Sequence, residues 1–134
     1  MNTWKRVLRL SRYIVGGNIM KIVNLTPHTI RIIIGDETET LAIEPHGTVC
    51  RVIEDTKTVS SINGIPIRVS HPTAVEGLPP QQEGVVYFCS GMAASAAWQL
   101  GRTDVVCPST LADDIIRNEK GLTIAIKALK GNKP

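Results

Sequence analysis

The strongest constraint on the fold is that one segment of this 134-residue chain, GMAASAAWQLG at residues 91–101, has the composition of a helix. Alanine is the best helix former, Ser90 can cap the helix at its start, and Gly101 can end it in a left-handed turn. The apolar runs elsewhere are short and rich in Ile and Val, as in residues 20–25, 29–34 and 85–90, and such runs are typical of strands. The sequence therefore predicts an α+β fold, with a mostly antiparallel β-sheet and one Ala-rich helix.

Two hairpins are predicted from residues with special backbone preferences. Asn63-Gly64 lies between apolar residues in SINGIPIRV and is a strong hairpin signal. Near the C-terminus, residues 118–121 can turn a hairpin, and Thr110 and Asp113 before it form a capping-box pattern, so we expect a short helix or turn followed by the final hairpin. The small residues of the helix at 91–101 would let another backbone approach closely, either the sheet of the same chain or a second subunit.

Residues 1–19 differ from the rest of the chain in charge. They hold four basic residues and no acidic one, namely Lys5, Arg6, Arg9 and Arg12. The balance from Met20 onward is 15 − 4 = 11 basic against 12 acidic residues, so bulk charge does not favour binding of a nucleic acid polymer. We therefore divide the chain into a basic extension, 1–19, and a single α+β domain, 20–134.

Three interpretations of the extension are open. It is a targeting or membrane-surface segment, a helix that packs on a partner protomer, or sequence upstream of a natural translation start at Met20. The third interpretation rests on Gly16-Gly17, whose codons can form a bacterial ribosome-binding sequence at a suitable distance from Met20. The nucleotide sequence of those codons would distinguish it from the others.

The cysteines and histidines do not predict a metal site, a disulfide framework or a cofactor. Three widely spaced cysteines are expected to be reduced thiols of a cytoplasmic protein, and the three histidines lie beside prolines at spacings that match no metal-ligand pattern. No apolar run is long enough to span a bilayer. Cys89-Ser90-Gly91 invites comparison with a nucleophile elbow, but the G-x-S-x-G pattern is absent, so a Cys- or Ser-dependent hydrolase is the less favoured alternative.

The same strand-to-helix turn at Ser90-Gly91 predicts an anion site. Free backbone N–H groups and the helix dipole favour phosphate at a helix start. Arg102 and Arg117 could add bidentate contacts to phosphates. The alternative is that these arginines form ion pairs on the surface, Arg102 with Asp104 and Arg117 with Asp113 or Asp114.

Four strings of the chain resemble a family of small phage and prophage proteins that open with N-L-T-P-H, a family that lies close to the phage Thoeris anti-defence sponges. These strings are MKIVNLTPHTIRI, VEGLPPQQEGVVYFCS, RTDVVCP and IIRNEKGLTIAIKAL, and the resemblance covers residues 20 to 130. It implies a protein of the infected bacterial cytoplasm that binds and sequesters a cyclic nucleotide immune signal without cleaving it, and that assembles as a homo-oligomer.

The resemblance also implies a set of ligand-binding residues, which are the polar side chains of the four strings. They are Asn24, Thr26 and His28 in the first, Ser90 in the second, Arg102 and Asp104 in the third, and Arg117 in the last. A sponge of this kind needs preorganised donors for phosphates and hydroxyls, and it needs no nucleophile, metal or cofactor. The other function that the sequence allows is a small oligomeric structural or accessory protein of a phage.

Overall fold

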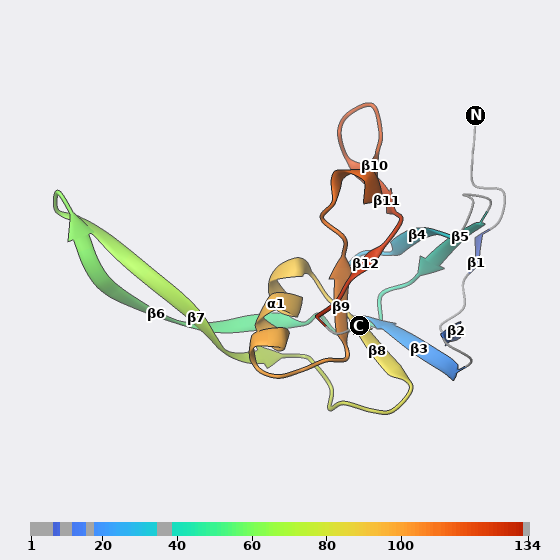
Figure 1. Cartoon of the computed structure of the whole chain (residues 1–134), viewed down its shortest axis with the longest axis horizontal. Coiled ribbons are helices and arrows are strands. Elements are labelled where there is room, and N and C mark those ends of the chain that lie inside the picture. Colours follow the sequence, from blue (N-terminus) through green and yellow to red (C-terminus); the bar gives the residue numbers. More distant parts are fainter. Residues whose placement is uncertain (1–6, 9–11, 16–17, 35–38, 133–134) are drawn as a thin grey trace.

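The computed structural model describes residues 7–8, 12–15, 18–34 and 39–132, which form two five-stranded sheets, a long two-stranded arm and one α-helix (Figure 1). The first sheet has the order β1 (Val7–Leu8), β5 (Glu39–Ile43), β4 (Ile30–Ile34), β11 (Thr123–Ile126), β10 (Ile115–Arg117). The central sheet has the order β12 (Leu129–Lys130), β9 (Val105–Pro108), β8 (Val85–Phe88), β3 (Asn18–Asn24), β2 (Arg12–Val15). The arm consists of β6 (Arg51–Ile62) and β7 (Ile65–Glu76). A short 3-10 helix, η1 (Ala112–Asp114), precedes β10.

The α+β class is confirmed, and both large sheets are mixed rather than purely antiparallel. Strand β8 pairs in parallel with β3 and with β9, and β4 pairs in parallel with β11. The helix α1 (Gly91–Gln99) lies between β8 and β9 in the sequence. A helical crossover returns the chain to the starting end of the sheet, so the two strands that it joins run in the same direction.

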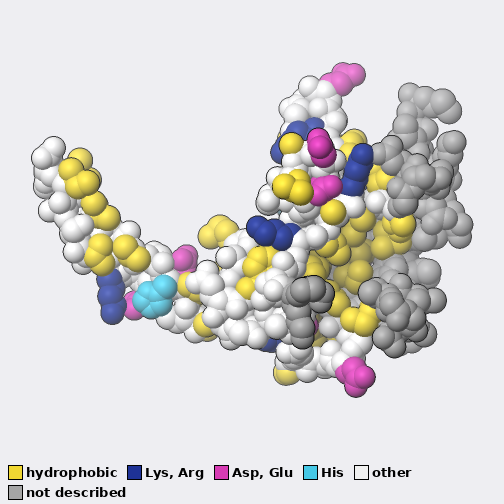
Figure 2. Space-filling model, viewed as in Figure 1, with side chains coloured by type: hydrophobic (Ala, Val, Ile, Leu, Met, Phe, Trp, Pro, Cys, Tyr) yellow, Lys and Arg dark blue, Asp and Glu magenta, His cyan; other side chains and the backbone are white. Residues whose placement is uncertain are grey.

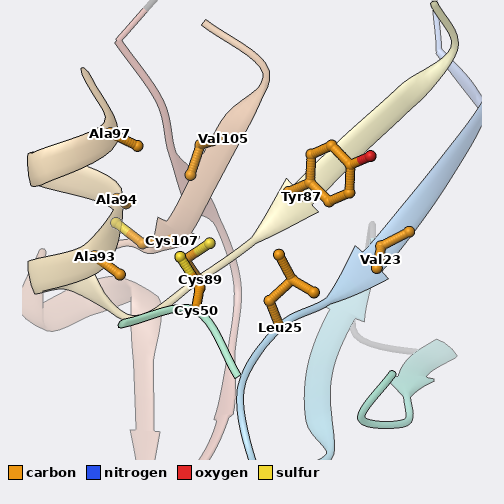
Figure 3. Packing of buried hydrophobic residues seen from close by; sticks show 10 residues of the cluster. All are labelled: Val23, Leu25, Cys50, Tyr87, Cys89, Ala93, Ala94, Ala97, Val105 and Cys107. Carbon is orange, nitrogen blue, oxygen red and sulfur yellow. The ribbon is translucent and has the colours of Figure 1, made fainter. Parts of the chain in front are cut away.

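The central sheet is covered on both faces, and this explains the continuous apolar run in β8. Tyr87 packs in a core cluster with Cys89 and the alanines of α1, while the neighbouring Phe88 packs in a second cluster with Ile30 and Ile126 of the first sheet. Figure 3 shows the first of these clusters, between α1 and the central sheet. Successive side chains of a strand point to opposite faces, so a strand between two layers needs apolar residues at every position.

The helix forms where the sequence predicted it. The Ser90 hydroxyl caps it by accepting a hydrogen bond from the backbone N–H of Ala93, and Gly101 follows it with a φ of +95°. Four alanines of α1 are buried, and three of them lie in the core cluster with Val105 and Cys107 of β9. Of the two packing partners that the small residues allowed, the structure therefore shows the chain's own sheet.

Both predicted hairpins are confirmed. Asn63 and Gly64 have φ values of +49° and +82°, the two positive values that a tight hairpin turn requires, and they join β6 to β7. The turn at residues 118–121 joins β10 to β11, with Gly121 N–H bonded to the carbonyl of Asn118. The helix expected before that hairpin is the single turn η1.

The described residues of the N-terminal extension form the edge strands β1 and β2 and the first two residues of β3. Strand β2 pairs antiparallel with β3, and β1 pairs in parallel with β5. The helix considered for this segment is not found at residues 7–8, 12–15 or 18–19, and its other residues lie outside the described ranges. Among the described residues, no helix is long and apolar enough to cross a membrane.

Candidate functional site

A pocket of about 550 Å³ opens where β3, β8 and β9 end, between the central sheet and the first sheet. Its wall comes from the turn after β3 and the start of β4, from the strand-to-helix turn at Ser90, and from β11. The lining residues are 26–31, Phe88, Ser90, Gly91, Pro108 and 123–126. The carboxyl ends of parallel strands are the usual place for a ligand in sheets with helical crossovers, and the volume is within the range of small-molecule sites.

The N-terminus of α1 supplies backbone donors at this pocket. The N–H of Ala93 is bonded to the Ser90 hydroxyl and that of Ala94 to the Ser90 carbonyl. Within the described residues, the N–H groups of Gly91 and Met92 have no hydrogen-bond partner. The helix dipole adds partial positive charge at the same end, and such a helix start generally stabilises an anion.

Asn24 shapes the turn that forms one wall of the pocket. Its side chain is buried, with the residue 1% exposed, and its amide donates to the carbonyls of His28 at 2.7 Å and Ile43 at 3.0 Å. Its Oδ1 accepts hydrogen bonds from both the N–H and the hydroxyl of Thr26. Asn24 is thus a positioning residue whose bonding atoms are all engaged, while Thr26 and His28 line the pocket.

The pocket lining also combines an apolar surface with a cation that the sequence analysis missed. Ile30, Ile124 and Phe88 form apolar wall, and Arg31 of β4 lines the pocket beside them. Arg31 makes no ion pair with the described part of the chain. The signal in the sequence was its place as the one charged residue in TIRIII, but only the tertiary structure places it in the same pocket as Ser90.

Arg117 approaches the pocket through another residue. Its guanidinium donates to the carbonyl of Gly121 at 3.2 Å and to the Thr123 hydroxyl at 3.0 Å, and Thr123 lines the pocket. The ion pair considered with Asp113 or Asp114 is not found; Asp114 instead accepts a hydrogen bond from the Ser109 hydroxyl. Arg117 is exposed, so its side chain lies at the rim of the pocket.

Arg102 and Asp104 lie elsewhere, beyond the C-terminal end of α1. The guanidinium of Arg102 donates two hydrogen bonds to the Asp104 carboxylate, at 2.9 and 2.8 Å, and one to the carbonyl of Pro79 at 2.8 Å. Its carbon Cζ lies 5.9 Å from the centre of the Tyr87 ring. This is the ion pair that the sequence analysis kept as the alternative to a phosphate contact, and neither residue lines the pocket.

The elbow-like turn at Cys89-Ser90 has the wrong environment for a nucleophile. Cys89 is fully buried, and its pKa is raised because its thiol hydrogen bonds to Cys50 and because burial disfavours the thiolate. The same hydrogen bond lowers the pKa of Cys50, which is also buried. The Ser90 hydroxyl accepts the capping bond from Ala93.

No protein-family model, curated protein or solved structure matches this chain. Among the described residues, no group of three or more His, Cys, Asp or Glu side chains is arranged to hold a metal ion. The function must therefore be argued from the pocket and from the resemblance in the sequence.

Proposed function

We propose that this protein binds a cyclic nucleotide signal in the pocket at the start of α1 and holds it without cleaving it, as a phage-encoded anti-defence sponge. One observation carries the proposal: the backbone N–H of Gly91, which has no partner among the described residues, lies at a pocket of about 550 Å³ that is also lined by Arg31. A phosphate is the anion that such a helix start accommodates best.

The rest of the pocket suits the remainder of a nucleotide. The apolar wall formed by Ile30 and Ile124 can cover a base, and the hydroxyls of Thr26 and Thr123 lie among the lining residues for a sugar. Arg117 at the rim can add a second cationic contact, because its guanidinium is exposed and already directed at Thr123. Binding without turnover needs only such preorganised contacts.

The proposal keeps part of the residue set that the resemblance implied. Thr26, His28 and Ser90 line the pocket, Asn24 positions the turn that holds Thr26 and His28, and Arg117 lies at the rim. Arg102 and Asp104 are left out, because their charged groups are bonded to each other away from this pocket.

Titration calorimetry with cyclic ADP-ribose isomers and cyclic di- and trinucleotides tests the proposal. We expect one of them to bind, to raise the melting temperature, and to be recovered intact after the complex is heated. Release of a hydrolysed product would indicate an enzyme instead, and no heat with any nucleotide would refute the proposal.

A matched pair of substitutions at Gly91 tests the backbone donor directly. Proline is tolerated at the first position of a helix and removes only the N–H, and Ser90 with φ −62° and ψ 161° has the conformation that a following proline requires. A Cβ at Gly91 meets no atom within 4 Å. Gly91→Pro should weaken binding by about 10- to 100-fold, the usual value of a charge-assisted hydrogen bond, whereas Gly91→Ala should bind normally.

Two arginine substitutions complete the test of the pocket. Arg31→Ala should weaken nucleotide binding by a similar factor, because it removes the cation of the lining, and lysine should restore it only in part. Arg68→Ala, on the exposed arm, is the control and should bind normally. Equal affinities for the Arg31→Ala and Arg68→Ala variants would contradict the placement of the phosphate.

A second function, a structural or accessory protein of a phage, is favoured by one feature, the arm formed by β6 and β7. An extended ribbon with exposed apolar side chains is typical of a protein that assembles with others. This function predicts no dependence on nucleotides, so the calorimetry above distinguishes it from the sponge.

A further inference from the structure

The arm has one apolar face and one polar face. Along β7, Ile65, Ile67 and Val69 alternate with Pro66, Arg68 and Ser70, and alternate residues of a strand share a face. Residues paired across the two strands share a face as well. The face of Ile65 and Val69 therefore also holds their partners Ile62 and Lys57. The other face holds the pairs Ser61–Pro66 and Thr56–Ser70. We call the first of these the apolar face of the arm.

This apolar face is exposed. Ile62, Ile65 and Val69 are 61%, 66% and 50% exposed, and every residue from 53 to 66 is in the exposed class. Figures 1 and 2 show the arm projecting from the body, with hydrophobic side chains gathered along its outer part. Only its root is packed, where Val52 and Val75 contact the core cluster under α1. A two-stranded ribbon is marginally stable by itself in water, so this face requires a covering partner.

The charges on the apolar face indicate which partner fits. Asp55 lies near the middle of β6, 4.0 Å from Lys57 and 3.9 Å from His71. Apolar residues occupy both ends of the face, with Ile53 toward the root and Ile62 and Ile65 at the tip. A twofold axis through the middle of the arm, perpendicular to it, exchanges root and tip and places Lys57 of each copy opposite Asp55 of the other. The pattern is thus complementary to a second copy of itself, as a twofold interface requires.

The size of the face fits a small interface between two crossed arms. Strand β6 has 12 residues, about 40 Å at the usual rise, and two strands are about 10 Å wide, which gives roughly 400 Å² per copy. Standard interfaces bury about 800 Å² per partner, and weaker ones bury less. The groove beside Met92 is lined by Val52, Ser70 and Pro72, on the polar side of the arm root, so the two apolar faces alone make the contact and the dimer belongs to the weaker class.

We propose that the arm is a dimerisation element, in which the apolar faces of β6 and β7 from two copies of this chain pack on each other in antiparallel orientation. This inference concerns assembly and does not depend on the pocket at the start of α1 or on its ligand.

Light scattering of the full chain at high micromolar concentration is the first test. We expect the mass of two chains of 14.6 kDa; a monomer, or any other mass, would overturn the proposal. The variant Ile65→Asp/Val69→Asp adds two carboxylates to the apolar face, and we expect its dimer dissociation constant to rise at least about 100-fold. The matched control Ser61→Asp/Ser70→Asp adds the same charge to the exposed polar face and should remain a dimer. If the two variants behave alike, the assignment of the face is wrong.

A mixing experiment tests the antiparallel orientation. Lys57→Asp makes the middle of the arm acidic, and Asp55→Lys makes it basic, so each variant alone should dissociate because like charges face each other across the twofold axis. An equimolar mixture should recover the dimer, since each copy then meets the opposite charge. Ion pairs within one arm cannot produce that recovery. A mixture that stays monomeric, or single variants that dimerise as well as the parent, would refute the antiparallel arrangement.

Discussion

Replacing Arg102 by alanine should destabilise the fold. The guanidinium donates two hydrogen bonds to Asp104 and one to the carbonyl of Pro79, so it ties the segment after α1 to the loop before β8. The Asp104 side chain is only 6% exposed, and without Arg102 its carboxylate would remain buried and unpaired.

The expected loss follows from this burial. Removing one partner of a buried ion pair costs about 3–5 kcal/mol, but the Arg102 side chain is 22% exposed, and water entering the space it leaves will solvate part of the Asp104 charge. We therefore expect a loss of about 2–4 kcal/mol in the free energy of unfolding, and a fall of roughly 10 °C in melting temperature for a domain of this size.

Urea unfolding of Arg102→Ala, Asp104→Ala and the double variant measures the effect. The double variant leaves no unpaired charge, so its loss should be smaller than the sum of the single losses by about 1.5–3 kcal/mol. Arg68→Ala, on the exposed arm, is the control. A loss below about 0.5 kcal/mol for Arg102→Ala would refute the structural role, and weakened nucleotide binding with unchanged stability would instead restore Arg102 as a ligand contact.

Three further predictions concern stability and accessibility. Gly77→Ala should lower the free energy of unfolding in urea by at least about 1 kcal/mol more than Gly64→Ala. Both glycines have positive φ, but only at Gly77 would the added Cβ lie 2.6 Å from a backbone oxygen, that of Val49. Equal losses would contradict this contact. Deleting residues 1–19 should leave a folded chain with a cooperative thermal transition, because the core clusters of the described residues begin at residue 22; a chain that no longer unfolds cooperatively would make β1 and β2 essential. The three free cysteines are buried, so a thiol reagent should label them slowly in the native protein and rapidly in urea; fast labelling without denaturant would contradict the packing of this core.

The sequence by itself determined the elements that depend on local chemistry. The helix at 91–99 follows from its alanines and from the Ser90 cap, and the turns at Asn63-Gly64 and at 118–121 follow from residues that accept positive φ or bond to their own backbone. Each of these features is decided within a few residues, so no knowledge of the rest of the chain is needed. The sequence also indicated the helix start at Ser90 as an anion site, for the same local reason.

Only the tertiary structure decided which strands are neighbours, and with that the pocket and the arm. Local signals do not tell a parallel pair such as β8 and β9 from an antiparallel one, because the pairing is set by the crossover through α1 and by apolar residues that need cover on both faces of the central sheet. Arg31 joins the pocket, and Arg102 leaves the predicted set, through contacts between segments far apart in the sequence. The long arm was predicted only near its turn, because its polar residues between 54 and 61 carry no burial pattern; the hydrogen-bonded partner strand determines its length, and a partner surface is needed to cover its apolar face.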